Sequence, residues 1–394
     1  MVLAFAMPIH LKFIPILIGV FVFLTLIDGI VNKTFSFNHK GIVITGLSFF
    51  LMHLLSVTYS ENKDAAWFDM EVKFSLLIFP LLFLFKNPFL LKMKKWVLIS
   101  FVFGSVVSSI IMLILAFSRF DGLNSYVFYY SELGLFHPSY MSMYFIFAIL
   151  IIVNIMDNNL KKLSHRIIAY ILILFLLVLI SQLQSKAGVL STIVISFYYL
   201  IFSFIGSKPL VMRISFFILA ISVSLIFVQK NSRLTAMAES VEKISEEGKS
   251  NSSTGVRYSM WKITANALED HWLIGVGAGD IKPVLFEKYE EAHLTKPIRN
   301  NYNVHNQYLE TFIGQGIIGI SLLLLLLLIG IREALKRKKL LLSGFILLIG
   351  LSMAPESMLN NQMGVVFIAF FYYFLFSFET DKNPKSIPST NNKK

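Results

Sequence analysis

The sequence of 394 residues contains no cysteine and few charged residues. Without cysteine it can form neither a disulfide bond nor a thiolate metal site, and thiols give no clue to the redox compartment. Charged residues make up 15% of the chain, against about 25% in soluble domains, whereas hydrophobic residues make up 56%. This composition argues against a soluble domain and favours a protein that lies mostly in a membrane.

Motifs of several common enzyme classes are also missing. The Gly-x-Gly-x-Gly run at residues 275–279 follows no βαβ pattern, so a dinucleotide-binding loop is not indicated. The sequence has no Gly-x-Ser-x-Gly elbow, no outer Asp-x-Asp pair, and no His, Asp and Glu cluster with metal-ligand spacing. We therefore expect a reaction that needs no metal, no cofactor and no nucleotide-sugar donor.

Apolar runs long enough to cross a bilayer recur along the chain. They predict an all-α fold, a polytopic transmembrane helix bundle of about 11–12 spans with one long, partly helical extracytoplasmic loop. The predicted spans are residues 11–30, 41–58, 68–86, 94–117, 137–155, 165–181, 187–206, 210–228, 307–330, 340–355 and 361–378.

The opening nine residues are apolar but too short to span a membrane. Two interpretations are open. Eleven spans with a cytoplasmic C-terminus would place the N-terminus outside, whereas a first span with its upstream part missing would give twelve spans with both ends inside.

Basic residues set the predicted orientation. Lys and Arg gather in alternate short loops and in the C-terminal tail, which predicts that these segments are cytoplasmic. The loop 229–304 is then extracytoplasmic, and its ten Lys/Arg are balanced by ten Asp/Glu. The formal net charge of +12 therefore reflects topology, and we expect no nucleic-acid partner.

The same pattern divides the chain into four parts. Residues 1–228 are expected to form an N-terminal bundle, 229–306 a loop carrying the active site, 307–378 the C-terminal spans, and 379–394 a disordered cytoplasmic tail. Within the loop, the sequence predicts helices over 233–247, 257–271 and 281–293, a turn at 275–279, and a glycine-containing break at 314–319 in the span that follows.

Ionisable side chains at the ends of spans are costly unless they are paired or line a wet cavity. Each also has a structural interpretation: Lys186 could extend to lipid headgroups, and His137, before Pro138, could simply begin a helix. The residues of this kind predicted on the outer face are Glu132, His137, Lys186, Arg257, His305 and Glu356.

Taken together, these residues resemble the O-antigen ligase / polysaccharide polymerase superfamily of bacterial inner-membrane glycosyltransferases, which implies a GT-C-like bundle. The resemblance rests on Arg257 with Trp261, Gly275/Gly277/Gly279, His305-Asn306-Gln307-Tyr308-Leu309-Glu310, Gly316-Ile317-Ile318-Gly319 and Ser185-Lys186-Ala187-Gly188. The chain departs from the family in having lysine at 186, which keeps the charge but loses the planar guanidinium fork. The His137-Pro138-Ser139-Tyr140 segment is also not the commonest form.

The resemblance implies a donor glycan on undecaprenyl pyrophosphate and a periplasmic reaction at the inner membrane. Arg257 and Lys186 would bind the pyrophosphate, and His305 would act as the base. The residues implied to support them are His137, Trp261, Gly277, Gly279, Asn306 and Glu310.

The acceptor stays open among three branches. We favour an O-antigen ligase acting on lipid A–core; the alternatives are an O-antigen or exopolysaccharide polymerase and a protein O-oligosaccharyltransferase. A lipid-linked glycan transporter or flippase is the rival from another class. It would predict two related halves and paired charges near the middle of the bilayer, and the sequence shows no internal repeat. A non-catalytic glycan-binding membrane protein would leave the pairing of Arg257 with His305 without a purpose.

Overall fold

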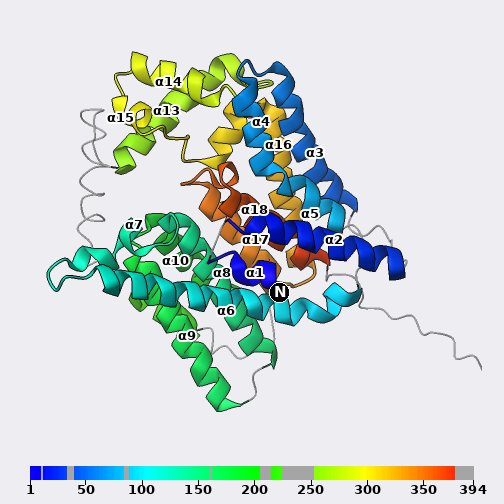
Figure 1. The fold of residues 1–394 in the computed structure, drawn as a ribbon, viewed down its shortest axis with the longest axis vertical. Helices are drawn as coiled ribbons and strands as arrows, with labels where there is room; N and C mark the ends of the chain where they lie inside the picture. Colours follow the sequence, from blue (N-terminus) through cyan, green and yellow to red (C-terminus); the bar gives the residue numbers. More distant parts are fainter. Residues whose placement is uncertain are drawn as a thin grey trace, which may run out of the picture.

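The computed structural model describes residues 1–9, 12–32, 40–83, 88–159, 162–204, 214–223 and 253–377. Within these ranges every regular element is a helix, which confirms the predicted all-α class (Figure 1). The predicted helix over 233–247 and the tail 379–394 lie outside the described residues.

The first half of the chain contains α1 (Val2–Ala6), α2 (Ile14–Asn32), α3 (Lys40–Tyr59), α4 (Lys63–Lys73), α5 (Ser75–Phe83), α6 (Pro88–Arg119), η1 (Ser125–Phe128), α7 (Tyr130–Leu133), α8 (Pro138–Asn159), α9 (Leu163–Gln182) and α10 (Lys186–Phe204). The second half contains α13 (Ser253–His271), α14 (Ile281–Glu291), α15 (Thr295–Arg299), α16 (Gln307–Lys336), α17 (Leu340–Met353), η2 (Met358–Asn360) and α18 (Gln362–Ser377).

Among the described residues, six helices are long and apolar enough to cross a membrane. They are Ile14–Val31, Lys40–Tyr59, Lys92–Arg119, Pro138–Asp157, Leu163–Gln182 and Gln307–Lys336. Four further predicted spans correspond to shorter apolar helices, Lys186–Phe202, Ile214–Val223, Leu340–Met353 and Gln362–Ser377. The chain is thus a polytopic helical membrane protein.

The span predicted over 68–86 is wrong as a single helix. The chain instead forms α4 and α5, which are separated at Phe74. Asn62 caps the start of α4 by accepting a hydrogen bond from the backbone N–H of Ala65. Because α4 carries charged residues along its length, it cannot be the first half of an apolar span.

The core of the bundle is aromatic. Almost all of α18 is buried, and its Phe367 and Phe371 pack against Phe101 of α6, Phe147 of α8 and Phe345 of α17. The Phe147 and Phe371 ring centroids lie 4.7 Å apart. Much of the chain's phenylalanine therefore fills the centre of the bundle, where large rings contribute packing between helices.

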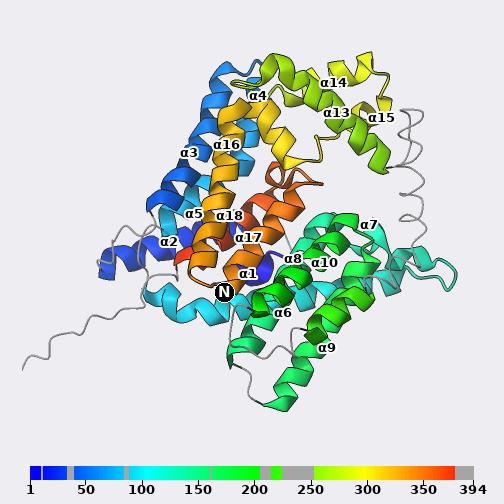
Figure 2. The same cartoon turned by 180° about the vertical axis from the view of Figure 1, so that it is seen from behind.

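Three helices of the long loop form a cap at one end of the molecule. Figures 1 and 2 show α13, α14 and α15 together beside the ends of α3, α4 and α16. A small hydrophobic core holds the cap together, with Met260, Leu285, Tyr289 and Val304 all buried. The predicted helices over 257–271 and 281–293 are confirmed as α13 and α14.

The predicted break at 314–319 lies at Gly316, whose φ of 63° and ψ of −161° are not helical. The two parts of α16 therefore run in different directions. The first part, before Gly316, packs near the connection between α17 and α18, because the Tyr308 hydroxyl donates to the Gly350 carbonyl at 2.8 Å. This brings residue 305, just before α16, close to residue 356.

Candidate active site

Arg257 lies on the second turn of α13, with its guanidinium directed at the α17–η2 connection. Nη1 donates to the Pro355 carbonyl at 2.8 Å, and Nη2 lies 3.3 Å from Oε2 of Glu356. The Arg257 side chain is 28% exposed, whereas that of Glu356 is 5% exposed. Arg257 thus neutralises a buried carboxylate and keeps part of its own surface open.

Glu356 links the other residues of the cluster to one another. Its Oε1 lies 2.7 Å from Nδ1 of His305, and its Oε2 lies 3.9 Å from Nδ1 of His137. Burial alone would raise the pKa of the Glu356 carboxyl. The hydrogen bond from His305 and the positive charge around the carboxylate outweigh burial, so the net pKa is lowered below 4.5. The carboxylate is therefore ionised at neutral pH.

This ionisation fixes the tautomer of His305. A carboxylate can only accept hydrogen bonds, so the nitrogen 2.7 Å away, Nδ1, must carry the proton. The Nη2 of Arg257 also lies 3.5 Å from this nitrogen, but two donors cannot bond to each other, so this is a close approach of two donors. Neutral His305 is left with the lone pair of Nε2, which can accept a proton.

The backbone around His305 is held in an uncommon conformation. His305 has a φ of 52°, its N–H donates to Oδ1 of Asn303 at 3.0 Å, and Tyr302 packs edge-on against its ring. A positive φ costs free energy for a residue with a Cβ and is most common at functional sites and tight turns. The fold therefore sets the direction of this imidazole.

Glu310 ties the two loops of the cluster to each other. Its Oε2 accepts hydrogen bonds from the Val304 N–H at 2.9 Å and the Ser357 hydroxyl at 3.0 Å, and its Oε1 accepts from Asn360 at 2.7 Å. Val304 precedes His305 and Ser357 follows Glu356. Glu310 thus fixes the spacing between these two side chains.

The other cation and the second histidine come from the first half of the chain. Lys186, the first residue of α10, donates to the Thr254 hydroxyl at 2.8 Å, three residues before Arg257 on α13. His137, just before α8, is 40% exposed. Burial lowers the pKa of His137 below 6.5, although the charge of Glu356 acts in the opposite direction. Both residues therefore border the cluster that Arg257 and His305 form.

The remaining predicted residues divide into two groups. Trp261 donates to the Val304 carbonyl at 3.0 Å, and Asn306 caps α16 by accepting from the Tyr308 and Leu309 N–H groups, so both support the His305 loop. Gly277 and Gly279 lie elsewhere, against Ser60 and Asn62 at the α3–α4 connection. The structure does not bring these glycines to the cluster.

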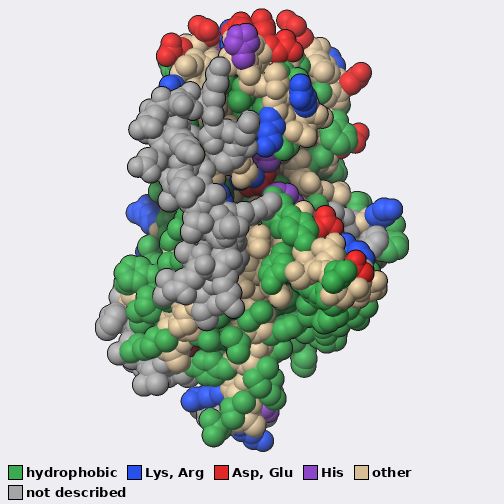
Figure 3. All heavy atoms as spheres, turned by 90° about the vertical axis from the view of Figure 1, so that its left-hand side faces the viewer, with side chains coloured by type: hydrophobic (Ala, Val, Ile, Leu, Met, Phe, Trp, Pro, Cys, Tyr) green, Lys and Arg blue, Asp and Glu red, His purple; other side chains and the backbone are tan. Residues whose placement is uncertain are grey.

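Figure 3 shows histidine and acidic side chains together in a recess between the cap and the helices below it. Across the described part of the chain, no group of three or more histidine or acidic side chains is arranged to hold a metal ion. The cluster contains cations, imidazoles and the carboxylates of Glu356 and Glu310 as its chemical groups.

Part of the chain is similar to a known protein family. Residues 168–324 match the family model described as O-antigen ligase. These residues form an O-antigen ligase domain. A relative in Haemophilus influenzae, an uncharacterized protein, is 24% identical over 301 residues, which cover 75% of this chain and 72% of the relative.

The O-antigen ligase domain contains Lys186, Arg257, His305 and Glu310 and ends within α16. The match of this segment indicates an enzyme of the ligase or glycosyltransferase type, with lipid-linked glycans as the general class of substrate. Glu356 and His137 lie outside the matched residues. The candidate site therefore combines the matched segment with two neighbouring parts of the chain.

The sequence placed Glu356 on the outer face but gave it no role. It lies 51 positions after His305, in a short turn without a recognisable motif. The available signal was its type: an acidic residue between two apolar helices must be paired or solvated.

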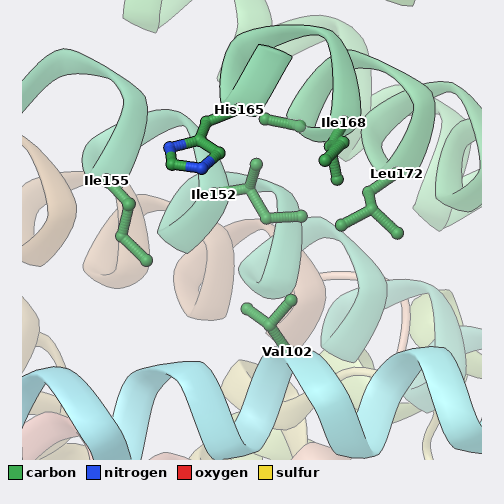
Figure 4. A pocket seen from close by; sticks show the side chains of 7 residues that line it. Val102, Ile152, Ile155, His165, Ile168 and Leu172 are labelled. Atoms are coloured by element: carbon green, nitrogen blue, oxygen red, sulfur yellow. The ribbon is translucent and has the colours of Figure 1, made fainter. Parts of the chain in front are cut away.

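A separate apolar hollow of about 210 Å³ lies between α6, α8 and α9 (Figure 4). Val102, Ile152 and Leu172 are among its lining residues, and His165 lies at its edge. It shares no residue with the cluster and lacks the polar groups that a sugar or pyrophosphate would require.

Proposed function

We propose that this protein is an O-antigen ligase that moves a glycan from undecaprenyl pyrophosphate to a hydroxyl of lipid A–core on the periplasmic face of the inner membrane. The observation that supports this most is the joining of Arg257, His305 and Glu356 by contacts of 2.7–3.5 Å. The donor carries an activated leaving group, so the site must supply a base and positive charge.

In the proposed step, the acceptor oxygen attacks the anomeric carbon of the donor glycan. The new C–O bond forms as the bond between that carbon and the pyrophosphate oxygen breaks, and the pyrophosphate leaves with the electron pair. The acceptor proton goes to Nε2 of His305. A base positioned in this way contributes roughly 10²–10⁴-fold to the rate.

Glu356 acts as a positioning residue in this scheme. By accepting from Nδ1, it keeps the Nε2 lone pair free for the acceptor and stabilises the imidazolium that forms. Arg257 has five N–H donors, and two of them are directed at Pro355 and Glu356. The others can face the departing pyrophosphate, where Lys186 would add a second charge.

The pairing of Arg257 with Glu356 explains why a second cation is needed. With both histidines neutral, the charge of Arg257 is formally cancelled by Glu356, which lies 3.3 Å away. Lys186 adds a further positive charge beside Arg257, next to Thr254 on the same helix. Binding of a pyrophosphate therefore depends on Lys186 even though Arg257 lies closer to the proposed base.

A deletion strain tests the proposal and identifies the acceptor. Lipopolysaccharide of lipid A–core alone indicates the ligase, core with one repeat indicates a polymerase, and intact lipopolysaccharide with lost protein glycans indicates protein glycosylation. Only the first result supports the ligase.

Complementation then tests the roles of the residues. His305→Ala should restore no ligation while reaching the membrane in normal amount, and Glu356→Gln should restore none when activity is compared at equal amounts of membrane protein. His271→Ala, which changes a histidine at the end of α13, should restore it fully. Ligation at the wild-type level by His305→Ala would remove this residue from the mechanism.

A further inference from the structure

The break in α16 exposes backbone groups that a membrane cannot satisfy. Three hydrogen bonds with the segment 272–277 satisfy these groups. The N–H groups of Val276 and Gly277 donate to the carbonyls of Ile313 and Gly314 at 2.8 and 2.9 Å. The Ile317 N–H donates to the Trp272 carbonyl at 2.8 Å. Within or beside hydrocarbon, an unsatisfied backbone group is strongly unfavourable because no water is there to bond it. The segment therefore completes the broken helix.

The side chains of the same segment point away from the protein. Trp272, Leu273 and Ile274 are 53%, 53% and 52% exposed, although each is large and apolar. Ile318, just past the break in α16, is 47% exposed as well. Three consecutive exposed apolar residues that continue onto the surface of a membrane span indicate a contact with something apolar.

The lengths of two neighbouring helices show where the segment 272–277 lies relative to the bilayer. α3 has 20 residues and is therefore about 30 Å long, which matches the hydrocarbon thickness of a bilayer. At its end, the Tyr59 hydroxyl donates to the Ile274 carbonyl at 2.7 Å. The part of α16 after the break, residues 317–336, has a similar length and begins at the same segment.

The opposite side of the cap is polar. Figure 3 shows acidic side chains gathered over the end of the molecule that the cap forms. Glu287, Glu290 and Glu291 of α14 are exposed. The cap thus has a charged surface suited to water and an apolar edge that meets the ends of two spans.

We propose that Trp272, Leu273 and Ile274 are inserted into the lipid bilayer at its boundary with water, where they anchor the cap. Trp272 and Tyr59 form part of an aromatic belt at this level. The anchor would fix the height of α13, and with it Arg257, above the hydrocarbon. This inference does not depend on the reaction catalysed.

The absence of cysteine permits a direct test with single-cysteine variants in lipid vesicles. Leu273→Cys and Ile274→Cys would each carry a nitroxide, with Leu328→Cys as a lipid-facing reference, since Leu328 is 62% exposed on α16. Glu290→Cys is the reference for water. We expect the nitroxides at 273 and 274 to be relaxed more by oxygen than by a water-soluble nickel complex, as at 328 and opposite to 290.

A second measurement uses the unlabelled thiols. A membrane-impermeant maleimide should react about tenfold more slowly at 273 than at 290, because apolar surroundings raise a thiol pKa by a unit or more. Nickel access and maleimide reactivity equal to those at 290 would overturn the proposal. Protection that disappears when the protein is diluted in the vesicles would indicate a second copy of the chain and would also overturn it.

Discussion

At the scale of single residues, the buried carboxylate of Glu356 determines how the cluster responds to substitution. A buried charge is stable only when it is paired and hydrogen-bonded. Glu356 meets this condition through Arg257 at 3.3 Å and His305 at 2.7 Å. Removing the carboxylate should therefore destabilise the protein as well as the proposed reaction.

Glu356→Gln should lower stability in a way that depends on pH. A carboxyl whose folded-state pKa is lowered contributes stability above its unfolded pKa and loses it as pH falls through the folded pKa. The wild type should be more stable than the variant by about 1.5–3 kcal/mol near pH 7. This difference should persist down to 4.5, the ordinary pKa, and shrink below it.

Thermal unfolding of both proteins in detergent, across this range of pH, measures the difference. His271→Ala serves as the control and should follow the wild type at every pH. A difference that closes well above 4.5 would contradict the lowered pKa.

Lys186→Gln should weaken donor binding with little change in kcat. Loss of a charge-assisted hydrogen bond to a pyrophosphate corresponds to about tenfold or more in KM for the donor. Lys186→Arg should restore the affinity because it keeps the charge, and Lys262→Gln on the exposed side of α13 is the matched control. Steady-state kinetics with a lipid-linked donor distinguish these outcomes; a fall in kcat with unchanged KM would refute the binding role.

Much of the proposed chemistry could be predicted from the sequence, because Arg257 and His305 belong to recognisable local motifs. The sequence also placed both residues on one face of the membrane, which made their meeting possible. The involvement of Glu356 could not be predicted, since its approach to His305 follows from the bend at Gly316 and the return of the chain through α17. The spacing of residues along the sequence does not predict a contact of this kind.

At the scale of elements, averages of hydropathy did not reveal two places where the chain changes direction within a predicted span. The run 68–86 is apolar on average, yet Asn62 begins one helix and Phe74 separates it from the next. In α16 the glycines did predict a break, because glycine alone tolerates the conformation required there. Capping residues and glycines were thus better guides to the ends of elements than mean hydropathy.

Gly316→Ala should destabilise the protein by about 1–3 kcal/mol from backbone strain alone. Its φ of 63° and ψ of −161° disfavour any residue with a Cβ, and that Cβ would overlap the backbone of Leu273. Gly41→Ala in α3 is the control, because nothing lies within 4 Å of its added methyl group. Thermal unfolding should show a loss only for Gly316→Ala; equal behaviour of the two variants would mean that the break is not required.

At the scale of the whole molecule, the arrangement joins distant parts of the sequence around one recess. Lys186 and His137 come from the first half of the chain, Arg257 from the cap, and Glu356 from the last helical pair. Span prediction could establish which ends of helices share a face of the membrane. It could not establish neighbours within that face, because packing of Phe101, Phe147 and their partners in the core decides them.

Orientation in the membrane is the prediction on which the proposed periplasmic reaction depends. The end of α16 and its connection to α17 carry basic residues, Arg332, Lys336, Arg337, Lys338 and Lys339, which should keep this connection in the cytoplasm. The cap at the other end of α16 should then face the periplasm. In cells with a permeable outer membrane, Glu290→Cys should react with an impermeant maleimide, and Lys336→Cys should react only after the inner membrane is opened. Labelling of both positions before the inner membrane is opened would show that α16 does not cross the membrane. Labelling of Lys336→Cys alone before opening would place Arg257 and His305 at the cytoplasmic leaflet. The proposed ligation to lipid A–core could not take place there.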